Sequence, residues 1–355
     1  MPDLKPGQRL PLLFFGMLSL LGGVLAGLAR LGWDVPTPAA QAAGVHGPLM
    51  IAAFFGTVIS LERAVAIGRG WAYLAPAAAG TGGLALLASA PLIVGQLLGL
   101  LAALGLLAAS SVAWSRQKAV FTVVLGLAAA CWLVGNLVWL NGGDIGAAVP
   151  WWLLFLVLTI AGERLELTRF LPTPPLARQL FIVIVGVLLG TAALGSDRLL
   201  AGGLIALAGW LLRYDIARRN IGGQGLTRFI ASCLLSGYAW LAVAGLLGLD
   251  GALVPGHPWR DAALHAISLG FVFAMVFGHA PIIFPAVTRI KIPYHPVLYL
   301  PLALLHLTLA LRIVGGLSDN FALRHYAALT NGFVLLVFIA TLAMRVRSKT
   351  PGGPS

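Results

Sequence analysis

The chain has 355 residues, of which 59% are hydrophobic and only 10% are charged, and its mean hydropathy is +0.95. Soluble domains are about 45–50% apolar and about 25% charged, so this composition excludes a soluble enzyme, a disordered tail and a nucleic-acid-binding module. The net charge is nevertheless +12, and the two cysteines, Cys131 and Cys233, lie in apolar segments that predict neither a disulfide framework nor a Cys-x-x-Cys metal site.

Apolar segments long enough to span a bilayer follow one another along the whole chain, since a spanning helix needs roughly 20 apolar residues. They predict an all-α, polytopic integral membrane bundle of about twelve transmembrane helices, folded as a single transmembrane domain over residues 1–355. The least certain division lies near Gly195, between the seventh and eighth segments. The expected cores are 11–30, 47–67, 72–90, 92–114, 120–140, 149–168, 179–196, 198–214, 228–248, 262–287, 296–316 and 326–345.

The basic residues alternate between the two sides of this arrangement. Of the 23 Lys and Arg residues, 18 fall on the side of the termini, and the other side holds only Arg30, Arg198, Arg260, Arg312 and Arg324. The positive-inside rule therefore predicts that both termini are cytoplasmic in a multi-pass protein of a bacterial inner membrane. The positive charge is a topology signal, and it predicts the lipid bilayer as partner and no nucleic acid.

Histidines are the most informative ionisable residues, because ionisable groups within a membrane are costly and point to function. Among the seven, His46 precedes the second segment, His265 lies about one turn into the tenth, and His325 begins the twelfth, all on the outer side. His257 and His295 are expected in loops, where they would be wetted by solvent.

A second group of histidines is expected deeper in the bilayer. His279 follows His265 by 14 residues, which places both on nearly the same helix face, and His306 reaches a comparable depth on the next helix. Pro281 and Pro285 predict a kink beside His279, because each proline removes a helical hydrogen bond.

Less specific interpretations stay open for each of these residues. A histidine in a membrane helix can simply form an interhelical hydrogen bond or wet a helix end. Asp261, one turn before His265, either orients that imidazole as an acceptor or caps the start of the helix.

Two regions resemble the NnrS family of membrane proteins. His46-Gly47-Pro48-Leu49-Met50, an apolar span and Gly68-Arg69-Gly70-Trp71 are similar to that family's second helix. The run Leu264-His265-Ala266-Ile267-Ser268-Leu269-Gly270, then Ala274-Met275, Thr288-Arg289 and Ala310-Leu311-Arg312, resembles its later histidine helix. Pro48 and Leu49 stand where the family pattern has a second His and a Glu.

The resemblance implies a haem- and copper-containing membrane protein linked to nitric oxide and denitrification. It also implies a remote similarity to the catalytic subunit of haem-copper oxidases, whose low-spin haem is held by histidines of helices two and ten. Here these would be His46 and His265, as ligands of a b-type haem. The sixth and seventh segments lack histidine, so the oxidase binuclear centre is not reproduced.

The leading hypothesis is therefore a haem-binding protein of NnrS type, with His46 and His265 as axial ligands of one iron and electron transfer as the activity. His279 and His306 would form a second haem or copper site, with His325 as a further metal ligand, and nitric oxide or another diatomic molecule would be the ligand. The alternatives are a proton-coupled secondary transporter without redox cofactor and a factor that handles haem or copper in transit. The sequence decides neither enzymatic turnover nor oligomeric state.

Overall fold

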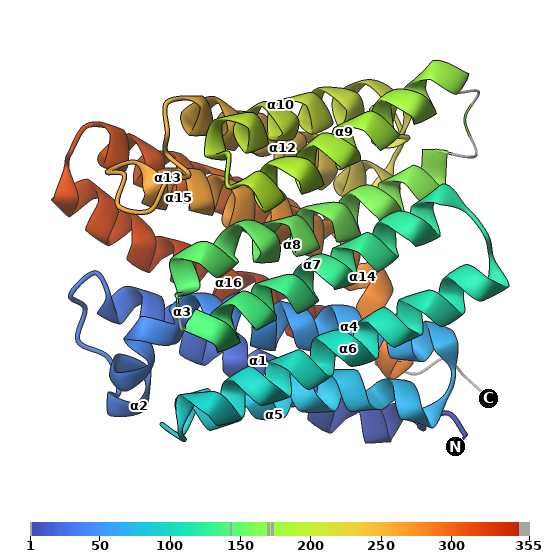
Figure 1. The fold of residues 1–355 in the computed structure, drawn as a ribbon, viewed down its shortest axis with the longest axis horizontal. Coiled ribbons are helices and arrows are strands. Elements are labelled where there is room, and N and C mark those ends of the chain that lie inside the picture. The colour runs from blue at the N-terminus through green and yellow to red at the C-terminus, as the bar shows by residue number, and fades with distance from the viewer. Residues whose placement is uncertain (1, 143, 169–170, 172–173, 348–355) are drawn as a thin grey trace. The chain divides into compact units, whose positions relative to one another are not determined.

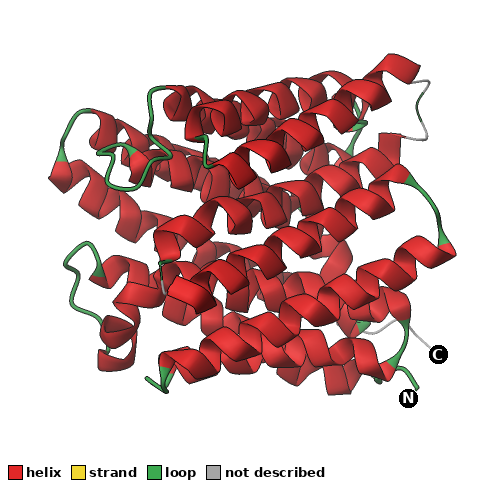
Figure 2. Ribbon diagram, viewed as in Figure 1, coloured by secondary structure: helices red, strands yellow, loops and turns green. Residues whose placement is uncertain are grey.

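The computed structural model describes residues 2–142, 144–168, 171 and 174–347. These residues are almost entirely helical and contain no strand (Figure 2). Ten of the helices are long and apolar enough to cross a membrane. The chain is thus an all-α, multi-pass membrane protein, as the hydropathy pattern predicted.

The remaining two expected spans are helical as well, but α5 (Leu74–Leu87) has only 14 residues and α10 (Asp197–Tyr214) has 18 residues with charged ends. α5 alone would rise about 21 Å, which is short of a hydrocarbon core of about 30 Å. The preceding 3₁₀-helix η3 (Gly70–Tyr73) adds about 8 Å to that length. The expected number of about twelve spans therefore depends on these two helices.

The described residues form two compact units, one ending at Glu166 and the other beginning at Leu167. Figure 1 labels the helices and colours them along the chain, from blue at the N-terminus to red at the C-terminus. The prediction of one transmembrane domain over residues 1–355 stays a prediction. Each unit has one long helix that carries a histidine near its start and changes its winding along its length. It comprises residues 46–67 in the first unit and residues 260–288 in the second, and it is called the histidine-bearing helix of that unit below.

In the first unit, α1 packs against the histidine-bearing helix and against α5, and α5, α6 and α7 follow one another as packed neighbours. Its helices, besides α5 and η3, are α1 (Pro6–Ala29), α2 (Thr37–Gln41), η1 (Ala42–Val45), α3 (His46–Pro48), η2 (Leu49–Phe55), α4 (Gly56–Ile67), α6 (Leu92–Arg116), α7 (Val120–Gly142) and α8 (Ile145–Thr168).

In the second unit, α12 packs against α10 and against the histidine-bearing helix, and α15 packs against α16. Its helices, besides α10, are α9 (Pro175–Leu194), α11 (Ala217–Asn220), α12 (Gly225–Leu249), α13 (Arg260–His265), η4 (Ala266–Phe273), α14 (Ala274–Thr288), η5 (Pro296–Leu298), α15 (Tyr299–Leu317) and α16 (Phe321–Arg347).

The division near Gly195 is sharp in the structure. Gly195 ends α9 in the left-handed conformation, with φ of 65°, and α10 starts two residues later. Glycine adopts this conformation without the steric cost that a Cβ atom brings, so the two residues Gly195 and Ser196 suffice to reverse the chain here.

Candidate functional site

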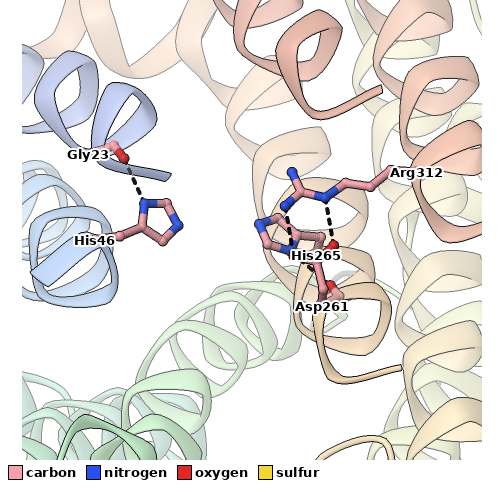
Figure 3. A network of polar contacts seen from close by, with 5 residues as sticks. All are labelled: Gly23, His46, Asp261, His265 and Arg312. Carbon is pink, nitrogen blue, oxygen red and sulfur yellow. Dashed lines mark hydrogen bonds and ion pairs between the residues drawn. The ribbon is translucent and has the colours of Figure 1, made fainter. Parts of the chain in front are cut away.

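His46 lies at the start of the histidine-bearing helix of the first unit, where a 3₁₀ turn gives way to α-helix. Its Nδ1 is 2.6 Å from the carbonyl oxygen of Gly23 in α1 (Figure 3). A carbonyl oxygen only accepts hydrogen bonds, so Nδ1 carries the proton and donates it. In the neutral imidazole the other nitrogen, Nε2, then bears the lone pair.

Gly27, one turn after Gly23 in α1, makes room for the same imidazole. A Cβ atom at this position would come 2.8 Å from Cε1 and 2.9 Å from Nδ1 of His46, which is closer than real Cβ contacts. The two glycines are four residues apart and therefore share a helix face. One supplies the acceptor and the other supplies the space, so together they define how the ring lies.

His265 ends α13 in the second unit, and its Nδ1 is also held. Nδ1 is 2.8 Å from the backbone oxygen of Asp261 and 3.3 Å from its carboxylate oxygen Oδ1. Nε2 of His265 makes no hydrogen bond with any residue that the structure describes. The imidazole therefore has the same proton arrangement as His46, with the lone pair on Nε2 in the neutral form.

Asp261 has a second partner in Arg312 of α15. The guanidinium Nε lies 2.9 Å from Oδ2 and Nη2 lies 2.8 Å from Oδ1, which is a two-point contact (Figure 3). The residue that caps α13 is Trp259, so the capping role considered for Asp261 is not the one seen. Instead, Asp261 contacts the imidazole of His265.

Both histidines are followed closely by π-helix, the wider winding that often marks functional sites. η2 begins three residues after His46, and η4 begins directly after His265. Hydropathy and residue spacing carried no signal for this winding, because an apolar segment looks the same in either helix type.

His306 is engaged at both ring nitrogens within the second unit. The indole Nε1–H of Trp240 donates to Nδ1 at 3.0 Å, and Nε2 lies 2.9 Å from the hydroxyl oxygen of Ser236. Because Nδ1 accepts, Nε2 carries the proton of the neutral ring and donates to Ser236. In this arrangement His306 has no lone pair to offer a metal ion.

His279 lies in α14, and its Nδ1 is 3.2 Å from the backbone oxygen of Met275 one turn earlier. Helical conformation continues through Pro281 and Pro285, so the kink expected beside His279 stays a prediction. The irregular winding lies on the N-terminal side of His279, in η4. The expected pairing of His279 with His306 stays a prediction.

The other three histidines have local contacts. The ring of His325 lies 5.5 Å from that of Phe321 and 5.4 Å from that of Tyr326. His257 and His295 each accept a backbone N–H two residues ahead, as loop histidines do. Within the described part of the chain, no three His, Cys, Asp or Glu side chains gather as a metal site.

Residues 9–347 match the family described as a domain of unknown function, DUF8744, and because the match covers nearly the whole chain, the protein belongs to this family. No curated protein matches the chain.

Proposed function

We propose that this member of the DUF8744 family is a haem-binding integral membrane protein of NnrS type, in which the imidazoles of His46 and His265 would hold haem iron. It would reside in a bacterial inner membrane with both termini cytoplasmic and take part in nitric oxide metabolism. The observation that supports the proposal best is that each of the two imidazoles donates a hydrogen bond from Nδ1 to an oxygen atom, which leaves the lone pair on Nε2.

A histidine that ligates iron through Nε2 must keep its proton on Nδ1, and such ligands almost always donate that proton to a carbonyl or carboxylate. His46 donates to the Gly23 carbonyl and His265 to Asp261. Each imidazole therefore has the tautomer and the fixed orientation that iron ligation requires before any haem is bound.

The chain's other features suit a non-covalently bound haem. The sequence holds no Cys-x-x-Cys-His run, so a b-type haem is expected rather than an attached one. When bound, haem with two imidazole ligands supplies one-electron transfer, because no coordination position remains open for a substrate.

A second haem or copper site at His279 and His306 is not part of this proposal. His306 uses both nitrogens on Trp240 and Ser236, and copper binding at either nitrogen would break the hydrogen bond that Trp240 donates. The residues present do not fit a metal at that position.

The test is the haem content of the purified protein, produced in cells supplied with a haem precursor and measured by acid-acetone extraction and a pyridine haemochrome spectrum. We expect b-type haem in the native chain and its loss in His46→Ala and in His265→Ala. His295→Ala is the matched control, because His295 is an exposed residue at the start of η5 and should leave the haem content unchanged.

Two results would overturn the proposal. Well-folded native protein without a Soret band would exclude a haem protein and favour the transporter alternative. Haem retained by both His46→Ala and His265→Ala would exclude these two residues as its ligands.

A further inference from the structure

Arg312 is a charged side chain in an otherwise apolar membrane helix. It lies near the C-terminal end of α15, and only 8% of its surface is exposed. Burial of a guanidinium is costly unless a charged partner compensates for the lost solvation. The Arg312 side chain therefore needs a specific reason to be in this position.

Its hydrogen bonds all go to one partner. Nε and Nη2 bind the two carboxylate oxygens of Asp261, and no other residue that the structure describes accepts from Arg312. A two-point contact between a planar guanidinium and a carboxylate fixes the rotation of both groups, which a lysine could not do. The pair therefore holds the Asp261 carboxylate in one orientation.

That orientation matters for His265, which lies one helical turn beyond Asp261 in α13. Oδ1 of Asp261 receives Nη2 of Arg312 at 2.8 Å and faces Nδ1 of His265 at 3.3 Å. The same carboxylate oxygen thus lies between the guanidinium and the imidazole (Figure 3). The backbone oxygen of Asp261 completes the acceptor pair around Nδ1–H.

We propose that Arg312 is a positioning residue for His265: it acts through Asp261 to keep the imidazole proton on Nδ1 and the Nε2 lone pair available to a ligand. This inference rests on the proposed role of His265 as a haem ligand. Isolated imidazole side chains favour the opposite tautomer, and one backbone carbonyl offers only a neutral hydrogen bond. The oriented carboxylate adds a charged acceptor, which shifts the tautomer equilibrium of His265 toward the Nδ1–H form.

A purely structural role for the pair is the competing account, because Asp261 and Arg312 also connect α13 to α15. The two accounts differ in what happens when both charges are removed together. Replacement of a buried ion pair by apolar residues of similar volume generally preserves the fold. The double variant Asp261→Leu/Arg312→Met should therefore stay folded while it removes the effect on His265.

The first experiment uses the haem-free full chain in detergent, with ¹⁵N-labelled histidine and NMR shifts that report the tautomer. His265→Gln identifies the signal of His265. We expect the Nδ1–H form in the native chain, and a mixture or the reversed tautomer in Arg312→Met and in the double variant. Arg312→Lys should restore the native form only in part, and Arg324→Met, which alters another arginine of the same unit, should leave it unchanged.

The second experiment adds haem b to the same apo-proteins and follows binding by the Soret band. We expect haem affinity to fall about 10- to 100-fold in Arg312→Met and in the double variant, the range typical for loss of a group that orients a metal ligand. Circular dichroism and size-exclusion chromatography establish that each variant is folded.

The outcomes separate the two proposals. If native protein binds no haem, the proposed function fails, while the tautomer in the haem-free chain still decides the role of Arg312. If the folded double variant keeps the Nδ1–H tautomer of His265 and native haem affinity, Arg312 only connects the two helices and the inference is overturned.

Discussion

At the residue scale, the orientation of His46 depends on two glycines in α1 that have different roles. Gly23 offers its carbonyl oxygen to Nδ1, and Gly27 leaves the space that the ring fills. A side chain at Gly27 would collide with the ring edge rather than with a flexible chain end. This position is therefore the most direct place to disturb His46 without touching it.

We predict that Gly27→Ala displaces the His46 ring, weakens its hydrogen bond to Gly23 and lowers haem content by about 10-fold or more, a typical penalty for misorienting a metal ligand. Haem extraction measures the effect. Gly126→Ala in α7 is the matched control, since a Cβ there meets nothing within 4 Å. Equal haem content in both variants would contradict the account of the Gly27 contact.

The sequence singled out His46 and His265 because ionisable residues stand out in apolar segments. It did not single out Gly27, because one glycine among 44 carries no signal of its neighbour. Arg312 was grouped with the outward-facing charges, and its pairing with Asp261 becomes visible only when α13 and α15 are seen side by side. A contact between residues that are far apart in the sequence cannot be read from the composition around either of them.

At the scale of elements, His306 serves as a link between α12 and α15. The indole N–H of Trp240 donates a hydrogen bond to Nδ1, and the hydroxyl of Ser236 accepts one from Nε2. The imidazole thus joins two helices through two hydrogen bonds. This is the less specific interpretation considered for the residue, and the geometry favours it over metal ligation.

We predict that His306→Leu destabilises the protein by roughly 1 kcal/mol, because the half-buried indole N–H of Trp240 loses its acceptor. Haem content should stay unchanged. Denaturant unfolding in detergent measures the stability, and the double variant His306→Leu/Trp240→Phe should recover part of the loss, since it leaves no unpaired donor. Loss of haem or copper from folded His306→Leu would instead support a second metal site.

The π-helical segments of the two histidine-bearing helices could not be predicted from the sequence. Pro281 and Pro285 drew attention to the inner part of the tenth segment, but the helix continues through both and the π-helix lies earlier. A proline shows in the sequence that one helical hydrogen bond is missing. A π-helix contains no residue type that identifies it in the sequence. The tertiary packing of these segments decides their winding.

At the scale of the whole molecule, the all-α membrane fold was predictable because burial in a bilayer imposes long apolar helices. Helix ends were predictable where the residue itself dictates the backbone, as at Gly195. The number of crossings is less directly encoded, since α5 is short and α10 has charged ends. The basic residues supply an independent prediction, because their alternation is regular only if both helices cross.

Cysteine labelling tests the crossing of α5 in a variant with Cys131→Ala and Cys233→Ala. If α5 crosses, Asp144→Cys, between α7 and α8, should react with a membrane-impermeant thiol reagent added outside the cells. Gln117→Cys, between α6 and α7, should then be protected. The reverse pattern would show that α5 does not cross and would contradict the twelve-span topology. Both positions are exposed in the structure.

The proposed ligation of haem iron by Nε2 of His46 and of His265 is visible in the low-temperature EPR spectrum of the oxidised, purified protein. We expect a low-spin ferric haem signal with imidazole ligation, which is lost from both His46→Ala and His265→Ala. A protein without haem, or a high-spin ferric signal that is identical in the native chain and in both variants, would contradict this ligation.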